Sequence, residues 1–227
     1  MLGLIWALVE PLGFMVIYLL VFSLIINLKI RDYPIFLLCG ILPWIYFSKS
    51  LNCTDAIIKD RLLVRKIYFP REVLPISSVL ARLVNFIISL FLLAFFLLIF
   101  NKLHFSYLPC VILIIFVQTL LSIGLALILS SLNVYFQDVK LLLDFVILLW
   151  FYCSPVFYPI DMVPLNLRNI YALNPMAGIL VSYRNIFFYN ISPLTKEFYM
   201  ASIISLFVFL LGFEIFNRLD RRIGDLV

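Results

Sequence analysis

Charged residues are scarce in this chain, since Asp, Glu, Lys and Arg together make up 13% of its 227 residues. Ordinary soluble domains contain about 25% of these residues and are roughly 45–50% apolar. Here 65% of the residues are hydrophobic, and the mean hydropathy is +1.16. A soluble core cannot hide so many apolar side chains. The composition therefore excludes a soluble domain and indicates an integral membrane protein.

Side chains that bind metals or carry out catalysis are also few. His104 is the only histidine, and the four cysteines (Cys39, Cys53, Cys110 and Cys153) form no close pair. Zinc sites need ligands at short, regular spacings, which are absent here. No phosphate loop of the G-x-x-x-x-G-K type occurs, so the chain does not bind ATP in that way. We expect no catalytic residue, no metal site and no cofactor within this chain.

Six continuous apolar runs predict an all-α protein with six membrane-spanning helices in one domain. A spanning helix needs about 20 mostly apolar residues, whereas barrel strands alternate over about ten. The predicted spans are residues 4–28, 35–51, 76–100, 108–135, 141–158 and 198–216. The first run is not a signal peptide, because it lacks a basic leading region and Glu10-Pro11 interrupts it.

Basic residues predict the orientation of these helices, because loops on the cytoplasmic side of a membrane are enriched in Lys and Arg. Six spans place both termini on one side. With the termini inside, eleven of the 17 basic residues are cytoplasmic: Lys49, Lys59, Arg61, Arg65, Lys66, Arg71, Arg82, Lys140, Arg218, Arg221 and Arg222. The net charge of +5 lies in short clusters between apolar runs, which favours an orientation signal over nucleic-acid binding.

Two connecting segments are predicted to be more than simple turns. The cytoplasmic segment 52–75 combines Arg and Lys with Tyr68, Phe69 and two prolines, a composition typical of a docking surface. An ordinary positively charged loop remains the alternative. The outer segment 159–196 is rich in aromatic residues, and Asn174-Pro175 predicts the start of a short amphipathic helix over 176–189. Its length favours a re-entrant or interfacial helix.

Carboxylates inside the apolar runs are functional candidates by default. Glu10, Asp144 and Glu214 all lie toward the predicted cytoplasmic ends, so we expect interfacial positions or pairing with nearby Lys or Arg. The absence of a carboxylate near the middle of a span argues against coupling to protons or sodium. Aromatic residues make up 17% of the chain; they suit both lipid contact and the stacking of sugar rings, and composition does not separate these uses.

Several passages together resemble the permease subunit of type-2 ABC exporters, in the branch that exports lipid-linked polysaccharides such as O-antigen, capsule or teichoic acid. The passages are residues 2–12 (LGLIWALVEPL), 40–44 (GILPW) with 47–51 (FSKSL), 66–75 (KIYFPREVLP), 154–159 (SPVFYP), 163–164 (VP) and 173–178 (LNPMAG). They follow the order of that family along nearly the whole chain.

The resemblance implies a homodimer in a bacterial cytoplasmic membrane, bound to two copies of a separate ATPase subunit that holds ATP and Mg. It implies a coupling element that docks on this ATPase, with residues Arg65, Lys66, Tyr68, Phe69, Pro70, Arg71 and Glu72. It also implies an outer gate with a pair of short helices before the last span, with residues Pro155, Phe157, Tyr158, Pro159, Asn174, Pro175, Tyr183 and Arg184.

Two other functions remain open from the sequence. The same permease fold is compatible with export of a drug or another small lipid. An intramembrane transferase acting on a lipid-linked sugar would have only Glu10, Asp144 and Glu214 as candidate groups. The family usually begins with a basic amphipathic helix, so the sequence leaves open whether the native chain begins upstream of Met1. The chain also departs from the family pattern at Leu62 and Val181.

Overall fold

The computed structural model describes residues 2–25, 30–52, 70–102, 106–136 and 138–226, and every regular element in these ranges is a helix. The helices are α1 (Leu2–Leu19), α2 (Tyr33–Leu51), α5 (Val73–Ile99), α6 (Leu108–Tyr135), α7 (Val139–Tyr152), α8 (Leu165–Ala172), α9 (Pro175–Phe187) and α10 (Lys196–Leu226). A π-helical turn, η1 (Leu20–Ile25), extends α1, and a 3-10 turn, η2 (Ile160–Met162), precedes α8.

Four of these helices are long and apolar enough to cross a membrane: α2, α5, α6 and the part of α10 up to Leu219. The helix α6 has the bounds expected for the fourth span. The helix α1 with η1 corresponds to the first predicted span, as a shorter apolar helix. The structure thus has four candidate spans and shorter apolar helices, and a count of six spans stays a prediction.

The fifth predicted span, 141–158, is wrong at its C-terminal boundary. The helix α7 contains 14 residues and ends at Tyr152, which is shorter than the roughly 20 residues that cross a bilayer. Cys153 still donates its backbone N–H to Leu149, but a chain turn follows. Pro155 explains the early end, since a proline lacks an N–H group and disfavours helical geometry in the residue before it.

The starts of three helices follow from proline positions. Pro34, Pro109 and Pro175 lie within the first two positions of α2, α6 and α9. The first N–H groups of a helix have no partner within the helix, so proline loses no hydrogen bond there and its fixed φ suits the helix. The short helix expected over 176–189 is confirmed as α9, with Asn174 as its N-cap.

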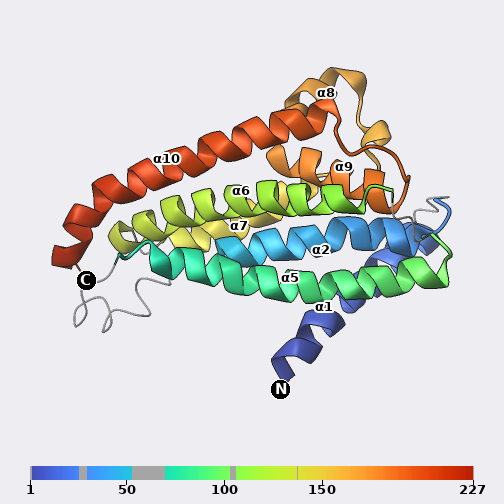
Figure 1. Ribbon diagram of the computed structural model, residues 1–227, viewed down its shortest axis with the longest axis horizontal. Coiled ribbons are helices and arrows are strands. Elements are labelled where there is room, and N and C mark those ends of the chain that lie inside the picture. The colour runs from blue at the N-terminus through green and yellow to red at the C-terminus, as the bar shows by residue number, and fades with distance from the viewer. Residues whose placement is uncertain (1, 26–29, 53–69, 103–105, 137, 227) are drawn as a thin grey trace.

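The helix α2 lies at the centre of the bundle (Figure 1) and packs against α1, α5, α6 and α9. Of its apolar window, 78% is buried inside the protein, against 22% for each of α5 and α10. Those two helices expose rows of large apolar side chains, such as Phe91 and Phe207. An unpartnered apolar face of this size fits contact with lipid.

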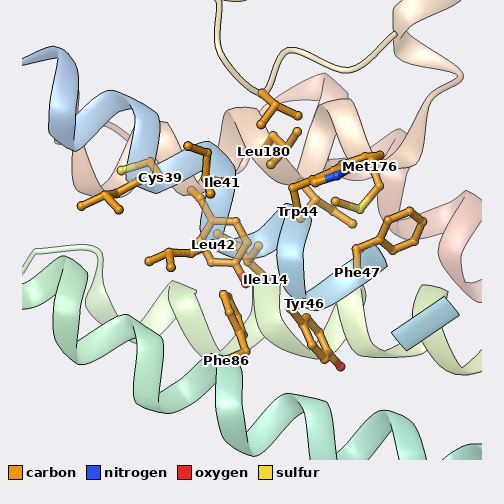
Figure 2. Close-up of a cluster of buried hydrophobic side chains, with 14 of the residues drawn as sticks. Cys39, Ile41, Leu42, Trp44, Tyr46, Phe47, Phe86, Ile114, Met176 and Leu180 are labelled. Atoms are coloured by element: carbon orange, nitrogen blue, oxygen red, sulfur yellow. The ribbon is translucent and has the colours of Figure 1, made fainter. Parts of the chain in front are cut away.

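The core around α2 is aromatic (Figure 2). Tyr46 of α2 stacks on Phe86 of α5 with ring centroids 5.1 Å apart. Trp44 and Phe47 of α2 lie in the same cluster, with Met176 of α9 beside them. All five side chains are buried. The short helix α9 is therefore part of the packed interior of the bundle.

The described elements next to the two predicted connecting segments lie at opposite ends of the bundle (Figure 1). One end holds α8, α9 and the beginnings of α2, α6 and α10. The other end holds the C-terminus, the end of α6 and the beginning of α5. This arrangement fits the expected segregation, and which end faces the cytoplasm stays a prediction.

The helices α6 and α10 run side by side at unusually close range. A Cβ atom added at Gly124 of α6 would lie 2.7 Å from the backbone of Phe209 in α10, and Gly212 of α10 faces the backbone of Gly124. Glycine at both positions lets the two backbones approach, as is common where helices pack within a membrane.

We therefore expect Gly124→Ala to lower the free energy of unfolding by about 1–3 kcal/mol, because the methyl group meets rigid backbone. Gly13→Ala is the matched control, because no atom lies within 4 Å of a Cβ added at Gly13. Thermal unfolding of the two purified variants in one detergent measures the difference. Equal melting temperatures would contradict this packing.

Candidate functional site

A cleft of about 300 Å³ lies between α1, α2 and α7. One part of its wall is aromatic and carries Phe14 and Tyr18 of α1, Trp44 of α2, and Phe151 and Tyr152 of α7. Tyr152 and Phe14 are exposed, whereas Trp44 and Phe151 are buried. The cleft therefore offers several flat apolar ring faces to a molecule that enters it.

Another part of the wall carries four polar side chains, those of Glu10, Ser48, Asn52 and Asp144, and aliphatic side chains of α2 and α7 complete the lining. Glu10 forms an ion pair with Lys49 of α2, which confirms the expected pairing of this carboxylate. Glu214 likewise pairs with Arg218, at 2.6 Å on α10. Glu214 does not line the cleft, so the three carboxylates considered for a transferase do not share one site in the described chain.

Asn174 joins the end of α7 to the start of α9. Its Oδ1 accepts hydrogen bonds from the backbone N–H groups of Met176 and Ala177 and from Nε1 of Trp150, at 2.9 Å. Its Nδ2 donates to Oγ of Ser154 at 2.9 Å and to the carbonyl oxygen of Cys153. The side chain of Asn174 thus caps one helix and holds the turn that ends the other.

The outer residues Tyr158 and Tyr171 meet through their hydroxyl groups, 2.6 Å apart. Tyr158 precedes η2, and Tyr171 belongs to α8. Burial raises the pKa of Tyr158, and the hydrogen bond to Tyr171 raises it further. The phenol of Tyr158 therefore stays neutral at physiological pH. Pro155, expected in the same region, is buried, and Pro159 directly precedes η2.

Tyr183 lies fully inside the bundle and binds a residue that the sequence reasoning missed. Its hydroxyl donates to Oε1 of Gln118 in α6 at 3.0 Å, and Nε2 of Gln118 donates to the carbonyl oxygen of Pro43 in α2 at 2.8 Å. Gln118 is completely buried. A single amide in the middle of a long apolar run was the available signal, because polar side chains in such runs commonly join helices.

Arg184 is buried in α9, with 2% of its surface exposed. Its Nη2 and Nη1 donate to the carbonyl oxygens of Val156 at 2.6 Å and Tyr158 at 3.1 Å. The guanidinium also lies over the ring of Phe36 in α2, at 3.8 Å from the centroid. The structure therefore brings most of the predicted gate residues together around α9 and residues 153–159.

The predicted coupling residues are only partly described. Arg65, Lys66, Tyr68 and Phe69 lie outside the described residues. Pro70, Arg71 and Glu72 form the turn that leads into α5, where the N–H groups of Val73 and Leu74 donate to Pro70 and Arg71 at 3.2 Å. Pro70 is exposed.

Comparison with known proteins identifies the family. The model of the ABC-2 type transporter family matches residues 1–188. The chain belongs to this family. Two relatives from Klebsiella pneumoniae, each named O-antigen export system permease protein RfbA, are 30% identical to it, over 100% and 99% of this chain and 88% and 87% of their own. A third, of the same name from Myxococcus xanthus, is 34% identical over 85% of this chain and 75% of its own.

Membership of the ABC-2 type transporter family confirms the resemblance that the sequence passages carried. It makes the chain a multi-pass membrane subunit of a transport system rather than an enzyme.

We expect Asn174→Ala to lower the free energy of unfolding by roughly 0.5–2 kcal/mol through the lost cap alone. Asn174→Asp is the matched variant, because it keeps the acceptor oxygens and loses only the donors to Cys153 and Ser154. The alanine variant should therefore melt at the lower temperature. Faster amide exchange at Met176 and Ala177 in the alanine variant, and not in the aspartate variant, would locate the effect.

Proposed function

We propose that this chain is the transmembrane subunit of an ABC exporter that moves an O-antigen-type, lipid-linked polysaccharide across a bacterial cytoplasmic membrane. The observation that carries the proposal is the likeness to O-antigen export permeases over nearly the whole of the chain. The chain acts as a homodimer with two copies of a separate ATPase subunit, and both of its termini face the cytoplasm.

The cleft between α1, α2 and α7 is one half of the path for the glycan in this proposal. A sugar ring has apolar C–H faces and a rim of hydroxyl groups. Aromatic faces such as those of Tyr18 and Tyr152 suit the C–H faces. Carboxylate and amide groups such as Asp144 and Asn52 suit the hydroxyl groups as hydrogen-bond partners. This lining stacks on successive sugars without requiring a particular one.

The energy for export comes from ATP in the partner subunit. Closure of the ATPase pair presses on the coupling element around Arg65 to Glu72, which leads directly into α5 through the turn at Pro70. Arg and aromatic side chains are typical anchors of protein interfaces. The outer gate, built from α8, α9 and residues 155–159, opens at the far end of the bundle.

Tyr152→Ala should lower ATP-driven export of the glycan about tenfold if stacking in the cleft matters, because stacking on an aromatic side chain contributes on the order of 1 kcal/mol or more. Tyr199→Ala is the matched control, since Tyr199 of α10 has 54% of its surface exposed, against 58% for Tyr152, and does not line the cleft. Export in proteoliposomes containing the complete transporter measures both. Equal export by the two variants would exclude the cleft from the path.

The double variant Tyr68→Ala, Arg71→Ala should weaken association with the ATPase subunit and reduce export. Arg218→Ala is the control, because it removes a cationic side chain from α10 that is paired with Glu214 one turn away. Co-purification from membranes and surface glycan in cells measure the two effects. Unchanged association and unchanged export in the double variant would overturn the coupling assignment.

Deletion of the gene separates polysaccharide export from export of a drug or small lipid. We expect loss of the surface glycan with no change in drug sensitivity. Altered drug sensitivity with an intact surface glycan would show that the same fold, with its ATPase partner, exports a drug or small lipid instead.

A further inference from the structure

Arg184 carries a positive charge into the interior of the bundle without an acidic partner. Among the described residues, no carboxylate forms an ion pair with its guanidinium, and the Nε atom has no hydrogen-bond partner. Its contacts are two backbone carbonyl oxygens and the face of Phe36. A buried charge held in this way costs free energy relative to an apolar side chain. The presence of this buried charge therefore needs an explanation, which we look for in the groups that Arg184 binds.

The two carbonyl groups that Arg184 binds lie on either side of Phe157. The carbonyl oxygen of Phe157 itself accepts a hydrogen bond from the hydroxyl group of Tyr33, at 2.9 Å. Three consecutive carbonyl groups, from Val156 to Tyr158, are thus held by side chains of α2 and α9. Backbone held at three successive positions has little freedom, so the direction of the Phe157 ring is fixed.

The ring of Phe157 packs against aromatic residues, two of which line the cleft. Its centroid lies 4.7 Å from that of Phe22 in η1, 6.0 Å from that of Tyr18 and 5.7 Å from that of Phe151. Tyr18 and Phe151 both line the cleft, whereas Phe157 does not. The ring of Phe157 therefore packs against aromatic residues of the cleft wall, beside the last turn of α7.

Gly40 of α2 completes this arrangement. A Cβ atom at this position would overlap the carbonyl oxygen of Val156 and lie 2.9 Å from Nη2 of Arg184. Only glycine leaves room for the carbonyl group and the guanidinium to meet beside α2. Gly40 of α2 and Arg184 of α9 thus both position the loop of residues 156–158.

We infer that Arg184 is a positioning residue that latches residues 156–158 and thereby keeps Phe157 closed against the aromatic wall of the cleft. The inference rests on the proposed function in one respect only, which is that the cleft belongs to the transport path. Backbone carbonyl groups bind the guanidinium less strongly than a carboxylate would. The latch therefore holds the closed state and still releases when the outer segment moves.

Leak through the resting transporter tests the latch. The chain is purified with its ATPase subunit and reconstituted into proteoliposomes that contain a small hydrophilic dye, without ATP or glycan. We expect Arg184→Met to leak dye at least about tenfold faster than the unmodified protein, because it loses both charge-assisted hydrogen bonds and even one of them shifts the closed state by about that factor. Arg184→Lys should leak at an intermediate rate, since one ammonium group does not reproduce the two-pronged geometry.

Glycine variants separate a latch from general loosening of the fold. Gly40→Ala should leak as Arg184→Met does, because its methyl group displaces the Val156 carbonyl group. Gly212→Ala is the matched control, because its methyl group also overlaps a backbone carbonyl oxygen, that of Gly124, but between α6 and α10. Both alanine variants should melt at lower temperature, and only Gly40→Ala should leak.

Two results would overturn the latch: dye retention by Arg184→Met and Gly40→Ala at the rate of the unmodified protein, or an equal leak from Gly212→Ala. Failure of the proposed function has a different signature. In that case the unmodified complex, supplied with ATP and lipid-linked glycan, exports nothing, whatever the leak of the variants without ATP.

Discussion

Lipid around a helix bundle offers no hydrogen bonds, so each polar group that this protein buries has to find its partner inside the chain. Buried serines bond to carbonyl groups of their own helices, whereas the amides of Gln118 and Asn174 join different helices. Gln118 of α6 connects Tyr183 of α9 to the carbonyl group of Pro43 in α2. Asn174 connects α9 to the end of α7. These bonds hold the short helix α9 within the bundle, where apolar packing alone has no preferred direction.

The position of α9 decides the arrangement of the outer end. Because α9 is fixed against α2 and α6, its last turn carries Arg184 to the loop that follows α7. That loop places Phe157 against the aromatic wall of the cleft. The hydrogen bonds that hold α9, the buried Arg184 and the ring of Phe157 are therefore linked by direct contacts. A shift of α9 would therefore move Phe157 relative to the cleft, through Arg184 and the loop that it binds.

The helices of this protein have two kinds of surface. The outer faces of α5 and α10 are apolar and mostly unpartnered, as lipid contact requires. The faces of α1, α2 and α7 instead enclose a cleft with aromatic and polar walls. Under the proposed function, the first surface anchors the chain in lipid and the second meets the polysaccharide. The proposal of glycan export unites the two observations.

The sequence by itself determined the membrane class, the helical fold, the family and the start of α9, because hydropathy, proline positions and an N-cap are local properties. Only the tertiary structure decided that Gln118 joins three helices and that Arg184 lies buried rather than at the surface. These features depend on partners more than 20 positions away in the chain. No local pattern encodes such partners, so a basic residue in an outer segment looks the same whether it faces water or holds a loop.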